Sequence, residues 1–124
     1  MKNSNKILYS VSGNIAILTI NRPERRNALD AETLEQINIL LDRAESDEKV
    51  RVILITGQGD TFSSGFDLKD QMEKAPEGKQ WKPILELDHR TIMRFWNSPK
   101  PTIAAVKGAC LAGAFELSLA CDFT

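Results

Sequence analysis

The residues best suited to do chemistry lie near the end of the chain, at positions 108–121. Glu116 is the only ionisable carboxylate or ammonium group in this stretch, and it follows Gly113 by three positions, on the same face of an expected helix. A carboxylate buried among small apolar residues must find hydrogen-bond donors or raise its pKa and keep a proton. The helix start supplies unpaired N–H groups, and Gly113 lets an anionic ligand come close. The stretch predicts an acid/base group beside an anion site. A structural alternative has equal weight, in which Glu116 stabilises its own helix.

A second small-residue segment, residues 61–70, follows the most apolar strand pattern of the chain, residues 50–56. This position corresponds to the carboxyl end of a buried strand, where open α/β sheets bind ligands. We therefore expect a second turn of exposed N–H groups here. The charged stretch Met72 to Lys82, which contains Pro76 and Gly78, is expected to be a mobile loop that could cover a site.

The remaining pattern supplies the elements that would hold these segments. Strands at residues 7–10 and 15–20 are expected to form a hairpin around Gly13-Asn14, and the apolar run 102–106 is expected to be another buried strand. Asp30 is the expected N-cap of a helix whose buried stripe is Leu34, Ile37, Leu41 and Ala44. A later helix carries an apolar stripe that includes the single histidine, expected to be a packed or edge residue, at Leu85, His89, Ile92 and Trp96. The order of strands and helices implies a parallel sheet, and another strand is expected after Asp122.

Composition narrows the function. The chain has 124 residues, enough for one domain, and a formal net charge of −1, which does not favour nucleic acid as a partner. No apolar run is long enough to span a bilayer, and the polar first six residues lack the apolar region of a secretory signal, so a cytoplasmic protein is expected. Cys110 and Cys121 are expected to be buried free thiols, and no metal-ligand spacing occurs. Neither a dinucleotide fingerprint nor a Walker-type ending is present.

The loop at residues 21–29 contains three arginines before the Asp30 helix. Such a loop can bind phosphates through bidentate hydrogen bonds, although a basic loop is more often only solvated.

The sequence resembles the crotonase family, also known as the enoyl-CoA hydratase/isomerase superfamily. The resemblance is carried by residues 55–69 and 108–122, together with Asn-Arg-Pro at 21–23 and Asn-Ala-Leu at 27–29. The resemblance covers nearly the whole chain. It implies an α/β fold, a crotonase-like ββα superhelix, of which residues 1–124 are the amino-terminal part of a single domain, from a longer product.

The resemblance implies an acyl-CoA thioester substrate, with coenzyme A as part of the substrate and no separate cofactor or metal. It places the two backbone donors of an oxyanion hole on Phe66 and Gly113, and the first acid/base glutamate on Glu116. An enolate oxygen is the anion that a helix start would stabilise, so the two arguments agree. The residues matching the CoA-lining region are Arg25, Arg26, Ala28, Ser64, Gly65, Asp67, Leu68 and Ala112. It also implies a role in fatty acid metabolism and a homo-oligomer, a trimer or dimer of trimers, in the complete protein.

Three departures from the family pattern bear on function. Phe66 stands where a small residue is common and is expected to narrow the acyl pocket. Ala112 and Ala114 replace glycines, and the second glutamate lies beyond Thr124.

The expected reaction is hydration of a 2-enoyl-CoA to a 3-hydroxyacyl-CoA. Isomerisation, decarboxylation or dehalogenation on the same hole stay open, as does a non-catalytic acyl-CoA-binding or interaction module. A serine protease using Ser63 or Ser64 lacks a nucleophile elbow and a credible base.

Overall fold

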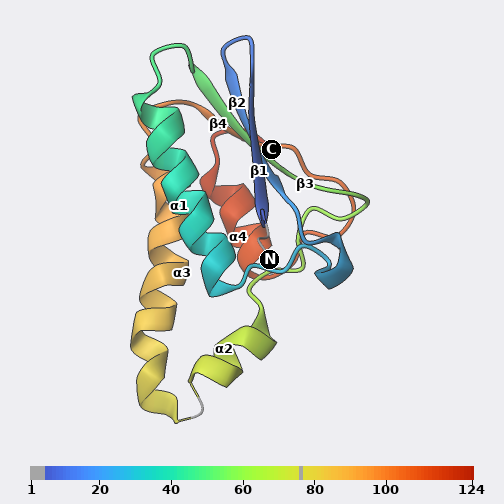
Figure 1. Cartoon of the computed structure of the whole chain (residues 1–124), viewed down its shortest axis with the longest axis vertical. Coiled ribbons are helices and arrows are strands. Elements are labelled where there is room, and N and C mark those ends of the chain that lie inside the picture. The colour runs from blue at the N-terminus through green and yellow to red at the C-terminus, as the bar shows by residue number, and fades with distance from the viewer. Residues whose placement is uncertain (1–4, 76) are drawn as a thin grey trace.

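A single four-stranded sheet organises the chain (Figure 1). The computed structural model describes residues 5–75 and 77–124, apart from the side chain of residue 79. The first four residues, which belong to the polar start noted above, and Pro76 therefore lie outside the described residues. The elements are β1 (Ile7–Ser12), β2 (Ile15–Ile20), a 3-10 turn (Pro23–Arg25), α1 (Ala31–Ser46), β3 (Val52–Gly57), α2 (Leu68–Lys74), a 3-10 turn (Gly78–Gln80), α3 (Trp81–Trp96), β4 (Thr102–Ala104) and α4 (Gly113–Ala120).

The sheet has the strand order β1-β2-β3-β4. β1 and β2 form the expected antiparallel hairpin, while β2, β3 and β4 run parallel, which confirms the parallel arrangement predicted from the strand and helix order. β4 is shorter than the apolar run 102–106 predicted. Ile103 forms a parallel bridge with Phe123, so the chain after α4 runs beside β4, as expected for the start of another strand.

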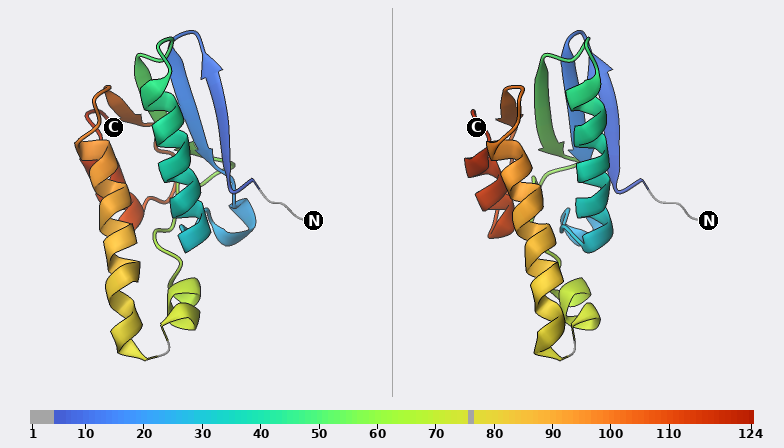
Figure 2. Two further views of the ribbon diagram at one scale, coloured as in Figure 1. Left: turned by 60° about the vertical axis from the view of Figure 1, so that its left-hand side comes forward. Right: turned by 90° about the vertical axis from the view of Figure 1, so that its left-hand side faces the viewer.

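Helices α1, α3 and α4 contribute to one core on one face of the sheet. The predicted stripe of α1 is confirmed: Leu34, Ile37, Leu41 and Ala44 are all buried, and Asp30 caps the helix by accepting a hydrogen bond from Thr33 N at 2.8 Å. The views in Figure 2 show α1 and α3 side by side, with α2 beside the amino-terminal end of α3, away from the sheet.

The region from Met72 to Lys82 is not the predicted loop. Helix α2 extends to Lys74 and α3 begins at Trp81, leaving a short connection. Asp67 caps α2 by accepting a hydrogen bond from Asp70 N at 3.1 Å. Pro83 lies in the first turn of α3, where the missing N–H has no helical partner to lose. Because of its charged residues and Pro83, this region resembles a loop in sequence, although two helices occupy most of it.

The buried face of α3 also differs from the prediction. Leu85 and Trp96 are 56% and 66% exposed, and His89 is also exposed, which fits the expected edge position and not a packed one. The buried residues are Asp88, Thr91 and Phe95. A hydrogen bond from Asn38 Nδ2 to Thr91 Oγ1, 2.8 Å long, turns this face toward α1. Hydropathy does not predict the burial of polar side chains such as Asp88 and Thr91.

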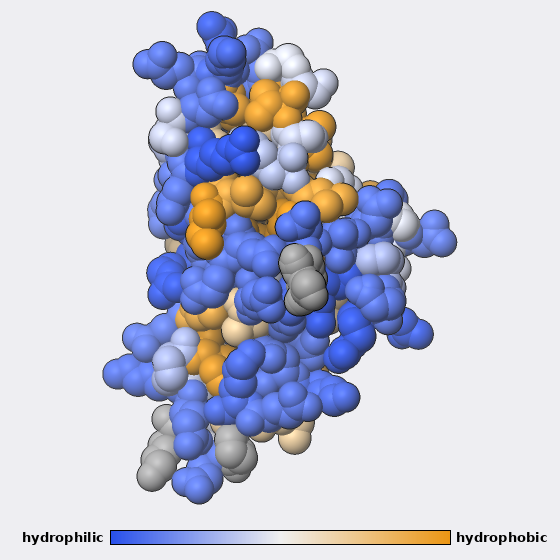
Figure 3. Space-filling model, viewed as in Figure 1, coloured by the Kyte–Doolittle hydropathy of each residue, from blue (hydrophilic) through white to orange (hydrophobic). Residues whose placement is uncertain are grey.

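The surface is mostly hydrophilic in the view of Figure 3, with hydrophobic side chains gathered in its upper half, where the strands lie, and in a smaller group lower down, in the region of α2 and α3. Both cysteines are free; Cys121 is buried as predicted and Cys110 only half-buried. Burial raises the pKa of the Cys121 thiol to about 11. Across the described part of the chain, no helix has the length and apolarity to cross a membrane, and no three metal-ligating side chains gather.

Candidate functional site

Two segments far apart in sequence, 62–66 and 107–113, run side by side at the carboxyl ends of the parallel strands. Phe62 N donates to Lys107 O at 2.8 Å, and Ser63 forms a parallel bridge with Cys110. Leu111 N then donates to Ser63 O at 3.1 Å. These bonds fix the register between the turn before α2 and the turn before α4. The two segments that the sequence singled out therefore form one structure.

Gly65 brings the segments into close contact. It has a φ of +101°, and a Cβ at this position would lie 2.7 Å from Leu111 O and 3.3 Å from Gly113 N. A side chain here would force the two turns apart. Because Gly65 precedes Phe66 directly, the amides of Phe66 and Gly113 lie close to each other. Within the described residues, neither N–H donates to a backbone acceptor. Two adjacent free N–H groups can bind a developing oxyanion.

The ring of Phe66 lies over Gly113. A Cβ at position 113 would be 2.5 Å from Phe66 Cε2 and 2.7 Å from Cζ. The ring is half-buried and forms part of a cavity wall, so the sequence-based view of Phe66 as a side chain that narrows the space beside its own N–H fits its position.

Glu116 lies in the first turn of α4, beside the same cavity. The cavity has a volume of about 350 Å³ and is lined by Phe66, Gln71, Leu85, Asp88, His89, Ile92 and Glu116. The prediction that Glu116 is buried is wrong for this chain, because its side chain is exposed. The apolar residues around it in sequence lie on other faces of α4, and several of these are themselves exposed. The carboxylate is therefore open to a ligand in the cavity.

Asp88 is a second carboxyl group in this cavity. Its residue is only 6% exposed, and it accepts a hydrogen bond from Gln71 Nε2 at 2.8 Å. Burial raises its pKa above the ordinary value; the bond from Gln71 opposes this, and the charge of Glu116 adds to it. Sequence analysis missed both Asp88 and Gln71. The available signal was a carboxylate at helical spacing from Thr91 and Phe95, beside the apolar stripe.

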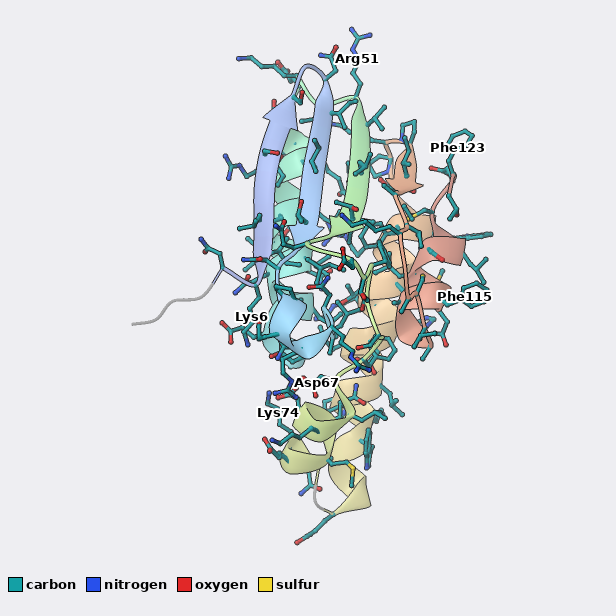
Figure 4. All side chains as sticks on the ribbon, turned by 90° about the vertical axis from the view of Figure 1, so that its right-hand side faces the viewer. Lys6, Arg51, Asp67, Lys74, Phe115 and Phe123 are labelled. Atoms are coloured by element: carbon teal, nitrogen blue, oxygen red, sulfur yellow. The ribbon has the colours of Figure 1, made fainter. Side chains whose placement is uncertain are left out.

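A cluster around Asp67 forms the adjoining part of the site (Figure 4). Asp67 is buried at the start of α2 and pairs with Arg22 at 3.2 Å and with Arg25 at 3.4 Å. Burial opposes its ionisation, but the bond from Asp70 N and the two arginines outweigh burial and lower its pKa. Arg22 also lies 3.3 Å from Asp30 and donates to Ala28 O at 2.6 Å. Of the three loop arginines, Arg22 therefore serves the fold and is not free for phosphate.

The other residues predicted to line a CoA site come together on this side. Leu29 N donates to Gly65 O at 2.8 Å and Ser64 N donates to Arg26 O at 3.0 Å, which places the arginine loop against the segment before α2. The side chains of Arg25, Arg26 and Leu68 are exposed and Ser64 is half-buried. Ala28, in contrast, is buried. Ala112 is exposed and adjoins Gly65.

The sequence profile of the enoyl-CoA hydratase/isomerase family matches residues 10–124. The chain belongs to the enoyl-CoA hydratase/isomerase family. Among curated relatives, it is 32% identical over 120 residues to the short-chain-enoyl-CoA hydratase of Clostridium acetobutylicum, covering 95% of this chain and 45% of that protein.

Solved structures of this family share the fold. The chain is 56% identical to an enoyl-CoA hydratase/isomerase from Xanthobacter autotrophicus Py2, with a TM-score of 0.93 over 97% of this chain and 45% of that one. An enoyl-CoA hydratase from Bacillus anthracis is 30% identical, with a TM-score of 0.89, and the match covers 96% of this chain and 46% of that one. The predicted crotonase-like α/β fold is confirmed. The chain spans less than half the length of these relatives, in keeping with the expected amino-terminal half of a domain.

Proposed function

We propose that this chain forms the part of an enoyl-CoA hydratase that binds and polarises an acyl-CoA thioester. The observation that carries the proposal is the pair of free N–H groups on Phe66 and Gly113, next to a cavity that Glu116 also lines. The thioester oxygen would accept hydrogen bonds from both groups. As negative charge develops on that oxygen, these bonds strengthen and lower the barrier to enolate formation.

Glu116 would move the proton. In hydration, the carboxylate removes a proton from water as the hydroxyl adds to C3, and the carboxylic acid so formed then delivers that proton to C2 of the enolate. The exposed position of Glu116 beside the cavity leaves room for that water. Phe66 supports the site through its ring, which covers Gly113 and limits the width of the acyl path beside the hole.

The CoA portion would lie over the loop formed by residues 25–28 and 64–68. Arg25 and Arg26 offer exposed guanidinium groups to phosphates, and Asp67 orients Arg25 through their 3.4 Å ion pair. Ala28, Ser64, Gly65, Leu68 and Ala112 complete the proposed lining. Coenzyme A then enters as part of the substrate. A homo-oligomeric cytoplasmic enzyme of fatty acid metabolism is proposed from the resemblance alone.

The site can be tested with a reaction that needs only one base. Exchange of the C2 hydrogens of butyryl-CoA with D2O requires the oxyanion hole and Glu116, but no second acid. We expect the chain to accelerate this exchange, and Glu116→Gln to lower the rate by about 10²-fold or more while retaining butyryl-CoA binding. Glu86→Gln, an exposed acid on α3, is the matched control and should leave the rate unchanged.

Two results would contradict parts of the proposal. Near-normal exchange in Glu116→Gln would remove this residue as the base. Binding of butyryl-CoA without exchange in the unsubstituted chain would favour the binding-module alternative. Crotonyl-CoA hydration, measured in parallel, reports whether this chain also adds water at C3.

A further inference from the structure

The cavity beside Glu116 is lined by apolar side chains and by buried polar side chains. Phe66, Leu85 and Ile92 supply apolar surface of the kind that suits an alkyl chain. The polar part of the cavity lining comes from Asp88 and Gln71, both of which are buried. Packing methylene groups against this pair would leave hydrogen-bonding capacity unmet, which costs free energy. A fully hydrocarbon acyl chain is therefore a poor complement to this cavity.

Asp88 differs from the other buried aspartates of the chain. Asp30 and Asp67 each contact Arg22, and Asp30 also contacts Lys6 at 2.7 Å. Within the described residues, Asp88 takes part in no ion pair, and its side chain accepts one hydrogen bond, from Gln71. A carboxyl group has more hydrogen-bonding positions than that single bond occupies. The remaining capacity is available to a ligand in the cavity.

The acidic side chains at the cavity further restrict which functional group a ligand can carry. Glu116 lines the same cavity, so a ligand carboxylate would meet one acid at Glu116 and a second at Asp88. A hydroxyl group avoids this repulsion, and it can donate to an ionised carboxylate or accept from a protonated carboxyl group. It therefore matches Asp88 in either protonation state. His89, which also lines this cavity, is exposed.

We propose that the cavity selects acyl-CoA thioesters that carry a hydroxyl group beyond C3 of the acyl chain, with Asp88, oriented by Gln71, as the specificity-determining residue. This inference rests on the proposed function, because it assumes that the thioester lies at Phe66 and Gly113. It adds to that function the class of acyl group and the side chain that recognises it.

The test compares matched ligands by calorimetry: butyryl-CoA with 4-hydroxybutyryl-CoA, and hexanoyl-CoA with 6-hydroxyhexanoyl-CoA and adipyl-CoA. We expect a hydroxyl-bearing ligand of suitable length to bind about 10-fold tighter than its methyl-terminated partner, the effect of one net hydrogen bond. In Asp88→Leu the order should reverse. In Asp88→Asn the hydroxyl preference should persist, while adipyl-CoA should bind more tightly than to the unsubstituted chain. Glu86→Gln should change none of these ratios.

Ratios of dissociation constants separate recognition from structural damage, because loosened packing between α2 and α3 would weaken both members of a pair. An absent hydroxyl preference, or one that survives in Asp88→Leu, overturns the inference while leaving thioester binding intact. If Asp88→Leu does not fold, unchanged adipyl-CoA affinity in Asp88→Asn overturns it. If no acyl-CoA binds to the unsubstituted chain, the proposed function fails and this inference fails with it.

Discussion

The ring of Phe66 covers the Cα of Gly113, so the two residues proposed to donate to one oxyanion also pack against each other. A methyl group at position 113 would meet three ring atoms at 2.5–2.7 Å. Stability of this contact and geometry of the site are therefore coupled.

We expect Gly113→Ala to lower the free energy of unfolding by about 1–3 kcal/mol, the usual range for overpacking. The loss should shrink in a Phe66→Ala background, because the ring is what the methyl group meets. Urea denaturation of the four proteins gives the coupling energy. Gly78→Ala is the control, since a Cβ there has Trp81 Cδ1 as its nearest neighbour at 4.0 Å. Additive effects would show that the two residues do not press on each other.

Arg22 should be the most stabilising of the loop arginines. It is 9% exposed and contacts two buried aspartates, so Arg22→Leu leaves carboxylates without their cation. We expect a loss of about 3–5 kcal/mol in the free energy of unfolding. Arg51→Leu, at an exposed position, should change it by no more than about 0.5 kcal/mol. Equal effects of the two substitutions would contradict a structural role for Arg22.

Asp30 should make the fold sensitive to acid. Burial opposes its ionisation, but hydrogen bonds from Lys6 and Thr33 and the charge of Arg22 lower its pKa from 3.8 to about 2. The unfolded chain therefore binds the proton more readily, and the stabilisation is present above about pH 4 and lost as the pH falls toward 2. Asp30→Asn should remove about 2 kcal/mol at neutral pH and less at pH 2. The measurement is urea denaturation across that range; a loss independent of pH would contradict the assignment.

Asp88 should make the stability of the fold depend on pH in the opposite direction to Asp30. Its pKa is raised in the folded chain, so folding favours the protonated form and ionisation at higher pH costs stability. This cost is absent below the ordinary value of 3.8 and grows as the pH rises through the raised pKa. We expect Asp88→Asn to gain stability relative to the unsubstituted chain between acidic and neutral pH. A difference that stays constant with pH would show that Asp88 ionises as freely in the folded chain as in the unfolded one.

The chain should self-associate. Large apolar side chains are exposed on α3, around α4 and at the end of the chain, and Figure 4 shows Phe115 and Phe123 pointing away from the ribbon. Exposed apolar surface of this kind promotes association. Light scattering should report species larger than a monomer, and Phe115→Ser with Leu119→Ser should reduce them. Ile39→Ser, which changes a 65% exposed residue on α1, is the control. A monodisperse monomer would contradict this expectation.

Much of the fold follows from local patterns. Strong apolar runs predicted β2 and β3, and the spacing of Leu34, Ile37 and Leu41 predicted the buried face of α1. The association of the two site segments followed from their place after parallel strands and from resemblance. These features depend on short-range periodicity, which one sequence records well.

The missed features depend on long-range polar contacts. The burial of Arg22 results from aspartates that are 8 and 45 positions away in sequence, and Thr91 is buried because Asn38 reaches it from α1. Leu117 is fully buried, while Leu85, Trp96 and Leu119 are exposed. Hydropathy alone cannot assign such residues, because their environment is set by which helices meet.

Ala112, the residue before α4, has a φ of 49° and a ψ of −122°. An L-residue in a conformation that only glycine adopts without penalty carries strain of about 1–3 kcal/mol. The contacts of Gly65 with Leu111 and Gly113 hold this conformation, because the two turns are locked together on either side of Ala112. The backbone at the start of α4 is therefore preorganised at the expense of overall stability: the fold, rather than an incoming ligand, bears the energetic cost of arranging the Gly113 amide.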